Sequence, residues 1–310
     1  MARDNNRYTL TRWQRLRVGI LYGMCRFVAI LPRWVRYYLL EEFIYFVLRY
    51  VMRYRRGVLM TNLRNSFPTK NEKELKAIAK RYYNYLAEQF INTLSVTGAS
   101  SKRMKQYLTF PDAEKYREAV KDTDVILMGG HYGSWEYFTA VALYDPDHVI
   151  MSIYHPLHSC VIDDLFKRMR RLENTALVPR DESLRYFLKN RSGDKRLAMG
   201  LIADQNPFFH RDVHWFKFLN QDTIFAEGGE QLARKLSLPV WFGGMRRRRR
   251  GEYEMYMEQL YDGREPVEEH EITERYVRRM EQAIEECPEL WLWSHRRWKY
   301  KPSDQQKREA

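Results

Sequence analysis

The residues of this 310-residue chain best suited to chemistry are His131 and Glu136, five positions apart. They follow a short apolar run and two glycines in the stretch VILMGGHYGSWE, residues 125–136. An apolar run that ends in glycines predicts a buried strand followed by a sharp turn. If a helix follows, its first backbone N–H groups favour negative charge beside His131, which creates a potential oxyanion site. Glu136 would then lie about one turn into that helix, within reach of the imidazole.

This pair suits the transfer of an acyl group to an alcohol. An alcohol is a weak nucleophile at neutral pH, and an imidazole can accept its proton in the transition state. A carboxylate on the other ring nitrogen fixes the tautomer and stabilises the imidazolium. We therefore predict His131 as the general base and Glu136 as its partner. Ser134 is an alternative nucleophile, but the sequence lacks Gly-x-Ser-x-Gly here, so we expect direct transfer with Ser134 near the substrate.

The elements that must position this pair alternate between strand and helix patterns. An α/β fold is therefore predicted, with a mixed, largely parallel central sheet flanked by helices. The expected strands span residues 125–128, 149–154, 176–178, 197–202 and 238–242, and the expected helices span residues 113–121, 134–143, 160–172, 227–235 and 271–286. Residues 71–94 form a further amphipathic helix, for which Asn71 is a suitable N-cap.

The N-terminal part of the chain differs in charge and pattern from the rest. Net charge is +13, and the first 70 residues carry +11 of it. Residues 13–31 and 34–54 read as amphipathic helices divided by Pro32, and charged residues interrupt each of them before a clean run of ~20 apolar residues is reached. We expect residues 1–56 to lie on an anionic membrane surface, ahead of a catalytic domain at 57–310. One short span and a soluble helical hairpin remain the alternatives.

Other signals weigh against metal, cofactor and nucleic-acid functions. The five consecutive arginines at 246–250 predict the turn of a β-hairpin, and no nucleic-acid motif accompanies them. His155 with His158, and His210 with His214, have spacings that could bind a metal. Acyl transfer to a hydroxyl needs no metal, so we predict no metal and no cofactor. The three separated cysteines fit a reducing compartment.

Several ordered motifs resemble one enzyme family. GGHYGSWE resembles the His-x4-Asp/Glu motif of glycerolipid-type acyltransferases. From about Leu31 to Lys301 the chain resembles the bacterial lipid A late acyltransferases more closely. The motifs that carry this resemblance are LPRWVRYYL, RRGVLMTNLRNSFP, IYHPLH, LVPRDESLRYFLKN, ADQNP, HWFKFLNQDTIFAEGGEQLARK and WLWSHRRWK.

The resemblance implies roles for further residues. Asp204 and Gln205 match a motif near the active site, and Arg180 matches a basic position that could bind acceptor phosphate. Tyr154 ends the second expected strand and His155 follows it, at a position where many relatives have Arg. These five residues are expected to bind substrate.

The resemblance also implies the substrates. The donor would be an acyl carrier protein or coenzyme A thioester, and the acceptor a membrane glycolipid such as a lipid A precursor. The enzyme would act at the cytoplasmic face of the bacterial inner membrane. A glycerolipid, an aminolipid or a mannosylated lipid is the alternative acceptor, and a catalytically silent membrane protein is the alternative to an enzyme.

Overall fold

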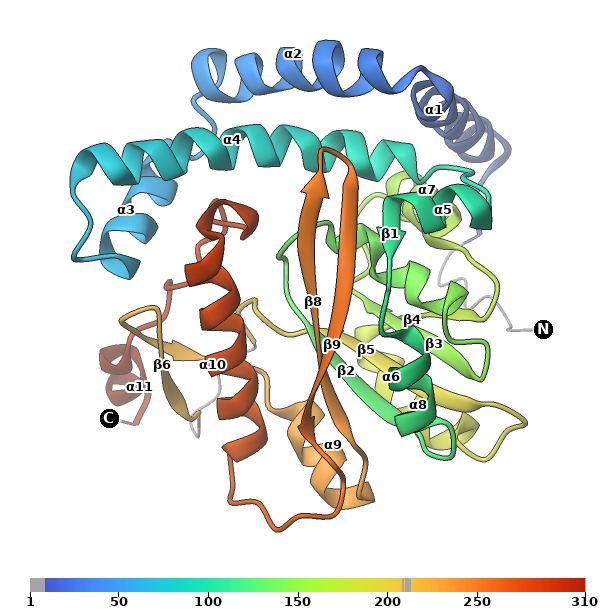
Figure 1. The fold of residues 1–310 in the computed structure, drawn as a ribbon, viewed down its shortest axis with the longest axis vertical. Coiled ribbons are helices and arrows are strands. Elements are labelled where there is room, and N and C mark those ends of the chain that lie inside the picture. Colours follow the sequence, from blue (N-terminus) through green and yellow to red (C-terminus); the bar gives the residue numbers. More distant parts are fainter. Residues whose placement is uncertain (1–8, 208, 210–212, 310) are drawn as a thin grey trace.

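A seven-stranded sheet forms the centre of the computed structural model, which describes residues 9–207, 209 and 213–309 (Figure 1). The strand order is β1-β9-β8-β2-β5-β3-β4. All neighbouring strands are parallel except β8 and β9. The predicted mixed, largely parallel sheet is therefore confirmed. The strands are β1 (Leu108–Thr109), β2 (Val125–Gly129), β3 (His148–Tyr154), β4 (Thr175–Pro179), β5 (Arg196–Ile202), β8 (Val240–Arg249) and β9 (Glu252–Tyr261).

Helices pack on both faces of this sheet, which explains why its central strands are apolar throughout. Every residue of β2 is buried. Ile126 and Met128 belong to a core cluster with residues of α9 (Gly228–Leu236) and α10 (Glu271–Glu286). Leu127 points to the opposite face and joins a second cluster. That second face carries α5 (Ser101–Tyr107), α6 (Ala113–Val120), α7 (Cys160–Arg170) and the 3-10 helix η3 (Trp135–Leu143).

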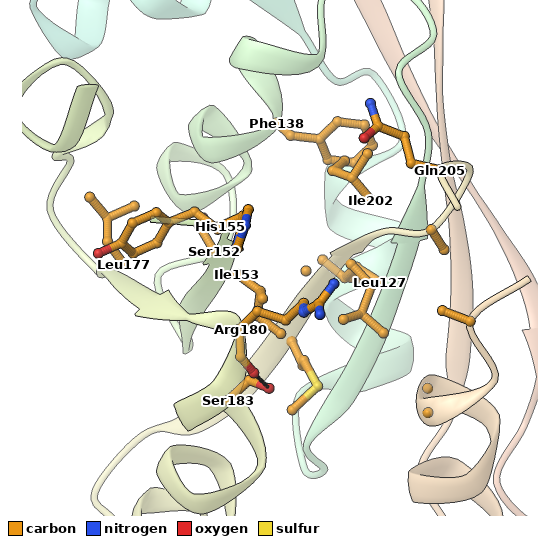
Figure 2. A pocket seen from close by; sticks show the side chains of 18 of the residues that line it. Leu127, Phe138, Ser152, Ile153, His155, Leu177, Arg180, Ser183, Ile202 and Gln205 are labelled. Carbon is orange, nitrogen blue, oxygen red and sulfur yellow. Dashed lines mark hydrogen bonds between the residues drawn. The ribbon is translucent and has the colours of Figure 1, made fainter. Parts of the chain in front are cut away.

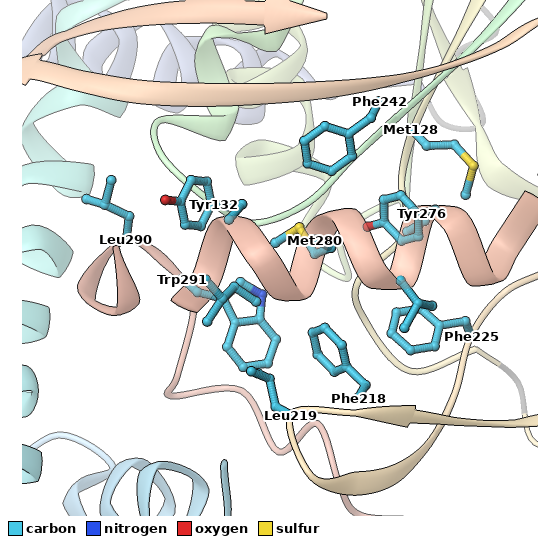
Figure 3. Packing of buried hydrophobic residues seen from close by; sticks show 14 of the residues in the cluster. Met128, Tyr132, Phe218, Leu219, Phe225, Phe242, Tyr276, Met280, Leu290 and Trp291 are labelled. Atoms are coloured by element: carbon cyan, nitrogen blue, oxygen red, sulfur yellow. The ribbon is translucent and has the colours of Figure 1, made fainter. Parts of the chain in front are cut away.

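Helix α10 organises the first core (Figure 3). Tyr276 and Met280 project from it toward the sheet, where Met128 and Phe242 lie. Its observed span, Glu271–Glu286, equals the predicted one. A clear apolar stripe at helical spacing made that prediction possible.

Helix α4 (Glu72–Ser95) lies between the sheet and the N-terminal helix α2 (Glu41–Phe46) (Figure 1). Asn71 caps it as predicted, since its side chain accepts hydrogen bonds from the backbone of Lys73 and Glu74. The carboxylate of Glu74 accepts a hydrogen bond from the backbone N–H of Asn71, which completes a capping box.

The arginine run is strand rather than turn. Arg246 to Arg249 continue β8, and the hairpin turns at Arg250 and Gly251. The prediction of a turn across all five arginines was therefore wrong. Partners along the hairpin explain the difference: Arg247 pairs with the buried Glu88 at 2.5 Å, Arg249 with Glu252 at 2.6 Å, and Arg246 lies over the ring of Tyr256 at 4.5 Å.

The N-terminal region is helical, as expected, but bent. Its helices are α1 (Arg12–Ile30), the π-helical η1 (Val35–Leu40), α2 (Glu41–Phe46), the π-helical η2 (Val47–Val51) and α3 (Arg56–Ser66). Within the described residues, no single helix passes the length and hydropathy test for a membrane span. The pair Arg12–Ile30 and Val35–Val51, bent by 105°, passes it together. The division of the chain at residue 56 stays a prediction.

Buried polar contacts attach this region to the body. Arg36 donates hydrogen bonds to Ser95 at 2.5 Å and to Tyr107 at 3.1 Å. Tyr37 and Asn92 share a hydrogen bond at 3.0 Å. Glu41 is fully buried and lies 3.6 Å from Arg250 of the hairpin. The helices therefore pack on α4 through specific polar pairs as well as apolar contacts.

The remaining elements were absent from the prediction. They are the hairpin β6 (Trp215–Phe218) and β7 (Gln221–Ile224), helices α8 (Ser183–Asn190) and α11 (Pro302–Glu309), and the 3-10 helices η4 (Arg180–Glu182) and η5 (Pro288–Leu290). The segment after η5 returns to the centre of the molecule, where Trp291 forms a bridge with Tyr132.

Candidate active site

The candidate site lies where parallel strands end at one edge of the sheet. β2 and β5 are neighbours, with Gly129 opposite Ile202. The residues that follow these strands, His131 and Asp204, are therefore brought together from 73 positions apart. The carboxyl ends of parallel strands are a common place for ligand sites in α/β folds.

Asp204 is the carboxylate that contacts His131. Its Oδ1 lies 2.8 Å from the Nδ1 of His131, and its Oδ2 accepts the backbone N–H of His131 at 2.9 Å. The indole of Trp291 donates to the same Oδ2 at 2.8 Å. Burial alone would raise the pKa of Asp204, but the charge of His131 and these hydrogen bonds outweigh it and lower the pKa. A charged Asp204 makes Nδ1 the protonated ring nitrogen.

The other nitrogen of His131 faces Gln205. Nε2 lies 3.1 Å from the Nε2 of Gln205. With the proton on Nδ1, the free lone pair of the ring accepts a hydrogen bond from this amide. A substrate hydroxyl bound to His131 would have to take the place of Gln205. The expectation that Asp204 and Gln205 lie near His131 is confirmed.

Glu136 does not contact His131, so the predicted partner was wrong. Its carboxylate forms a bidentate ion pair with Arg170 of α7. The Nε of Arg170 donates to Oε2 at 2.8 Å, and its Nη2 donates to Oε1 at 2.7 Å. Burial would lower the pKa of Arg170, but hydrogen bonding and charge attraction from Glu136 raise it. Glu136 lies in the first turn of η3, whereas His131 points across the strand end toward β5. The pair of Glu136 and Arg170 links η3 to α7 beside the site.

The loop between β2 and η3 has little conformational freedom and little space for added side chains. A Cβ on Gly130 would lie 2.8 Å from Met280 and 3.2 Å from Asp204. Gly133 has a φ of +65°, and its N–H donates to the carbonyl of Leu290 at 2.9 Å. The backbone N–H groups of His131 and Gly133 are thus already bonded. The expected oxyanion site cannot use these two donors, and η3 is a 3-10 helix rather than the expected α-helix.

A large cavity opens beside His131 (Figure 2). Its volume is about 1110 Å³, and its lining is mostly apolar. Tyr154, His155, Arg180 and Gln205 line it. Their role in binding substrate stays a prediction. His131 and Glu136 line the cavity as well. A cavity of this size and lining suits a long hydrocarbon chain with polar groups at its mouth.

Ser134 does not belong to this cavity. It is fully buried and its Oγ accepts a hydrogen bond from Asn92 of α4 at 3.3 Å. The prediction that Ser134 binds substrate was wrong, because the loop turns its side chain toward α4 instead of the cavity.

The sequence reading missed several residues around the site. Arg170 and Trp291 contact the two acidic side chains, and the cavity lining adds Lys167. Asn206 contacts both His295 and the buried Arg297. Burial lowers the pKa of His295 to about 4 and that of Arg297 to about 10. His295 and Arg297 belong to the WLWSHRRWK motif, which the sequence analysis had singled out, whereas no sequence signal pointed to Arg170 or Lys167.

The two histidine pairs with spacings that could bind a metal were not predicted to hold one. Among the described residues no group of three or more His, Cys, Asp or Glu side chains could hold a metal ion. His155 lines the cavity, and His210 lies outside the described residues. The absence of a metal from the mechanism stays a prediction.

Comparison with models of known protein families matches residues 6–300 to the bacterial lipid A biosynthesis acyltransferases. The chain belongs to this family. Among solved structures, this acyltransferase is similar to the 1-acyl-sn-glycerophosphate (LPA) acyltransferase PlsC from Thermotoga maritima. The two share 13% identity, with a TM-score of 0.35 and coverage of 84% of this chain and 100% of the other. A search of curated proteins gives no match.

Family membership identifies the chain as an enzyme that transfers acyl groups to a lipid. The resemblance found in the motifs is therefore confirmed. The alternative of a catalytically silent membrane protein loses its basis.

Proposed function

We propose that this acyltransferase moves a fatty acyl group from an acyl carrier protein or coenzyme A thioester to a hydroxyl of a membrane glycolipid, a lipid A precursor. One observation carries the mechanism: His131, bound through Nδ1 to the charged Asp204, borders a large apolar cavity. This arrangement supplies a base and a place for an acyl chain within one site.

The reaction follows from the two nitrogens of His131. The acceptor hydroxyl displaces the amide of Gln205 and donates to Nε2. Its oxygen attacks the thioester carbonyl carbon while Nε2 takes the proton, and Asp204 stabilises the imidazolium. The tetrahedral intermediate then expels the thiolate, which recovers the proton from Nε2. The ester bond forms, the thioester bond breaks, and no acyl-enzyme is needed.

The cavity fits the substrates of such a transfer. Its apolar lining removes the hydrocarbon chain from water, which stabilises binding by ~0.8 kcal/mol per methylene group. Arg180 lines the cavity, as does Lys167, which is paired with Asp163 at 3.1 Å. Phosphate or sugar groups of the acceptor would be recognised there, because guanidinium and ammonium groups bind phosphate well.

The N-terminal helices would place this site at a membrane. Among the described residues, 18 large apolar side chains are exposed, and 14 of them lie between Trp13 and Met52. We call these 14 side chains the docking face. Trp13, Leu16, Ile20, Met24 and Phe27 recur at helical spacing along α1. Such a face beside many arginines suits an anionic membrane surface. We place the enzyme at the cytoplasmic face of the bacterial inner membrane, where thioester donors and lipid A precursors meet.

The test is acyl transfer from a labelled acyl carrier protein thioester to a purified lipid A precursor, with coenzyme A thioester as a second donor. Wild type should form the acylated lipid, and His131→Ala should lose most of the rate, by about 10³-fold or more. Glycerolipid, aminolipid and mannosylated acceptors are run in parallel. Transfer to one of these but not to the lipid A precursor would overturn the proposed acceptor. Equal rates for wild type and His131→Ala would overturn the proposed base.

A further inference from the structure

The cavity beside His131 reaches both faces of the sheet. Strand β5 lies between β2 and β3, yet the consecutive residues Gly200, Leu201 and Ile202 are all partly accessible and all line the cavity. Neighbouring residues of a strand point to opposite faces. The cavity therefore extends along both faces of the sheet at β5, with one arm on each face.

The first arm lies between the sheet and helices η3 and α7. The register places Ser152 beside Gly200 on one side and Leu177 on the other, so these three residues share a face. Leu127 and Ile150 belong to the core cluster on that face, and Phe138 of η3 packs against it. We call this space the η3 arm.

The second arm lies on the opposite face, against α8 and α9. Met199 and Leu201 point there and join the other core cluster. Leu184 and Leu188 of α8 and Leu232 of α9 complete the lining. We call this space the α9 arm. Figure 2 shows Phe138 beside Ile202 in one part of the cavity and Arg180 near Ser183 at the start of α8 in another.

The two arms meet at the strand ends, where His131 and Gln205 lie. A direct transfer requires donor and acceptor to be bound at the same time. Resting on the proposed function, the geometry points to simultaneous binding of two hydrocarbon chains, one in each arm, with both polar ends at His131. The α9 arm takes the acyl chain of the thioester, and the η3 arm takes a hydrocarbon chain of the acceptor lipid.

The surroundings of the arms decide this assignment. Helix α7, which covers the η3 arm, packs against α1 of the docking face. A chain that leaves the membrane therefore enters the η3 arm by the shorter route. Helices α8 and α9 lie toward the opposite end of the molecule (Figure 1).

The rim of the α9 arm suits a donor that arrives from water. Leu184 and Leu188 are 54% and 49% exposed there. The exposed cations Arg185, Lys189 and Lys235 lie on the same two helices. The acids Asp181 and Glu182 lie in η4, directly before α8, and offset part of this charge. Carrier-bound thioesters carry phosphate, which such cations attract.

Two adjacent residues give a matched pair of variants. Gly200→Leu fills the η3 arm, and an added Cβ there would meet only the carbonyl oxygen of Met151 at 3.4 Å. Leu201→Trp fills the α9 arm. Leu201→Ile is the control for packing, and Leu184→Asp is a second α9-arm variant at an exposed position that folding does not depend on.

The probe is dodecanoate with a diazirine at its terminal carbon, photolysed with the full-length protein and mapped by peptide mass spectrometry. Wild type should show adducts in η3–α7 peptides and in α8–α9 peptides. Gly200→Leu should lose the first set only, and Leu201→Trp or Leu184→Asp the second set only. Adducts in only one set, or loss of both sets in either variant, would overturn the two-arm proposal. This labelling does not require catalytic turnover, so its result is independent of the result of the acyl-transfer assay.

Kinetics then test which chain each arm takes. Gly200→Leu should raise KM for the lipid acceptor and leave the preferred donor chain length unchanged. Leu201→Trp should shift the preference to shorter donor chains and leave the acceptor KM unchanged. The reverse pattern would overturn the assignment of the arms.

Discussion

At the scale of single residues, the site contains two carboxylates with separate roles. Asp204 is buried and contacts His131, whereas Glu136 contacts Arg170. A histidine can act as a base through Nε2 only when its proton is held on Nδ1, and Asp204 supplies that constraint. Glu136 and Arg170 instead connect two segments that line the cavity.

The ion pair of Glu136 and Arg170 predicts a loss of stability when it is broken. Glu136→Gln leaves the guanidinium of Arg170 with a neutral partner in a largely buried place, because its side chain is only 28% exposed. We expect a loss of about 2 kcal/mol in the free energy of unfolding, measured by urea denaturation. The double variant Glu136→Gln with Arg170→Gln should recover part of it. If Glu136→Gln is as stable as wild type, the ion pair contributes nothing to the free energy of unfolding.

At the scale of elements, the sequence predicted α10 and the strands β2, β3, β4 and β5 well, because each has a regular apolar pattern. The arginines of β8 were misread, since five like charges are typical of a solvated turn. The strand continues because its arginines find partners, and one of these, Glu88 of α4, is distant from Arg247 in sequence. The π-helical η1 and η2 have no distinct spacing that could reveal them.

The docking face predicts how the N-terminal helices bind membranes. Ile20, Met24 and Phe27 of α1 are 55%, 61% and 61% exposed, so their replacement by Ser leaves the fold intact. Each replacement should weaken binding to phosphatidylglycerol-containing vesicles by about ten-fold, or ~1.4 kcal/mol, in a cosedimentation assay. Added salt should weaken wild-type binding as well, because it screens the arginines.

The control for this experiment is Leu184→Ser, which removes an equally exposed apolar side chain at the other end of the molecule. It should bind vesicles like wild type. Unchanged binding of a variant that carries Ile20→Ser, Met24→Ser and Phe27→Ser together would contradict the docking face.

At the scale of the whole molecule, two buried groups predict how stability depends on pH. Burial and the nearby charge of Glu88 raise the pKa of Glu41 to about 8. Burial lowers the pKa of His148, but its contacts with Asp145 and the carbonyl of Thr123 outweigh this and raise it. In both cases the native state keeps a proton that the unfolded chain releases at lower pH. Their stabilisation is therefore present at low pH and lost as pH rises through the native pKa.

The free energy of unfolding should accordingly fall between about pH 5 and pH 8, with a slope of up to ~1.4 kcal/mol per pH unit for each such proton. Glu41→Gln should flatten this slope, since the amide does not titrate. Urea denaturation at a series of pH values measures it. A slope that is the same in wild type and Glu41→Gln would contradict the account of Glu41.

The site itself shows what a sequence can and cannot predict. His131 was found from its place between a strand and a helix, and Asp204 and Gln205 from the ADQNP motif. The partner of His131 was misassigned because Glu136 is close in sequence, whereas Asp204 is close only through the pairing of β2 with β5. Ser134 was placed in the cavity for the same reason. Nearness across a sheet cannot be read from spacing along the chain.

The central claim is that His131 acts with Asp204, and one measurement tests it most directly. The rate of acyl transfer to a lipid A precursor is compared between wild type and Asp204→Asn, with Glu136→Gln as the matched control. The account predicts that Asp204→Asn lowers kcat by about 10³–10⁴-fold, because an amide no longer stabilises the imidazolium, while Glu136→Gln keeps most of the rate. A larger loss of kcat in Glu136→Gln than in Asp204→Asn would contradict it.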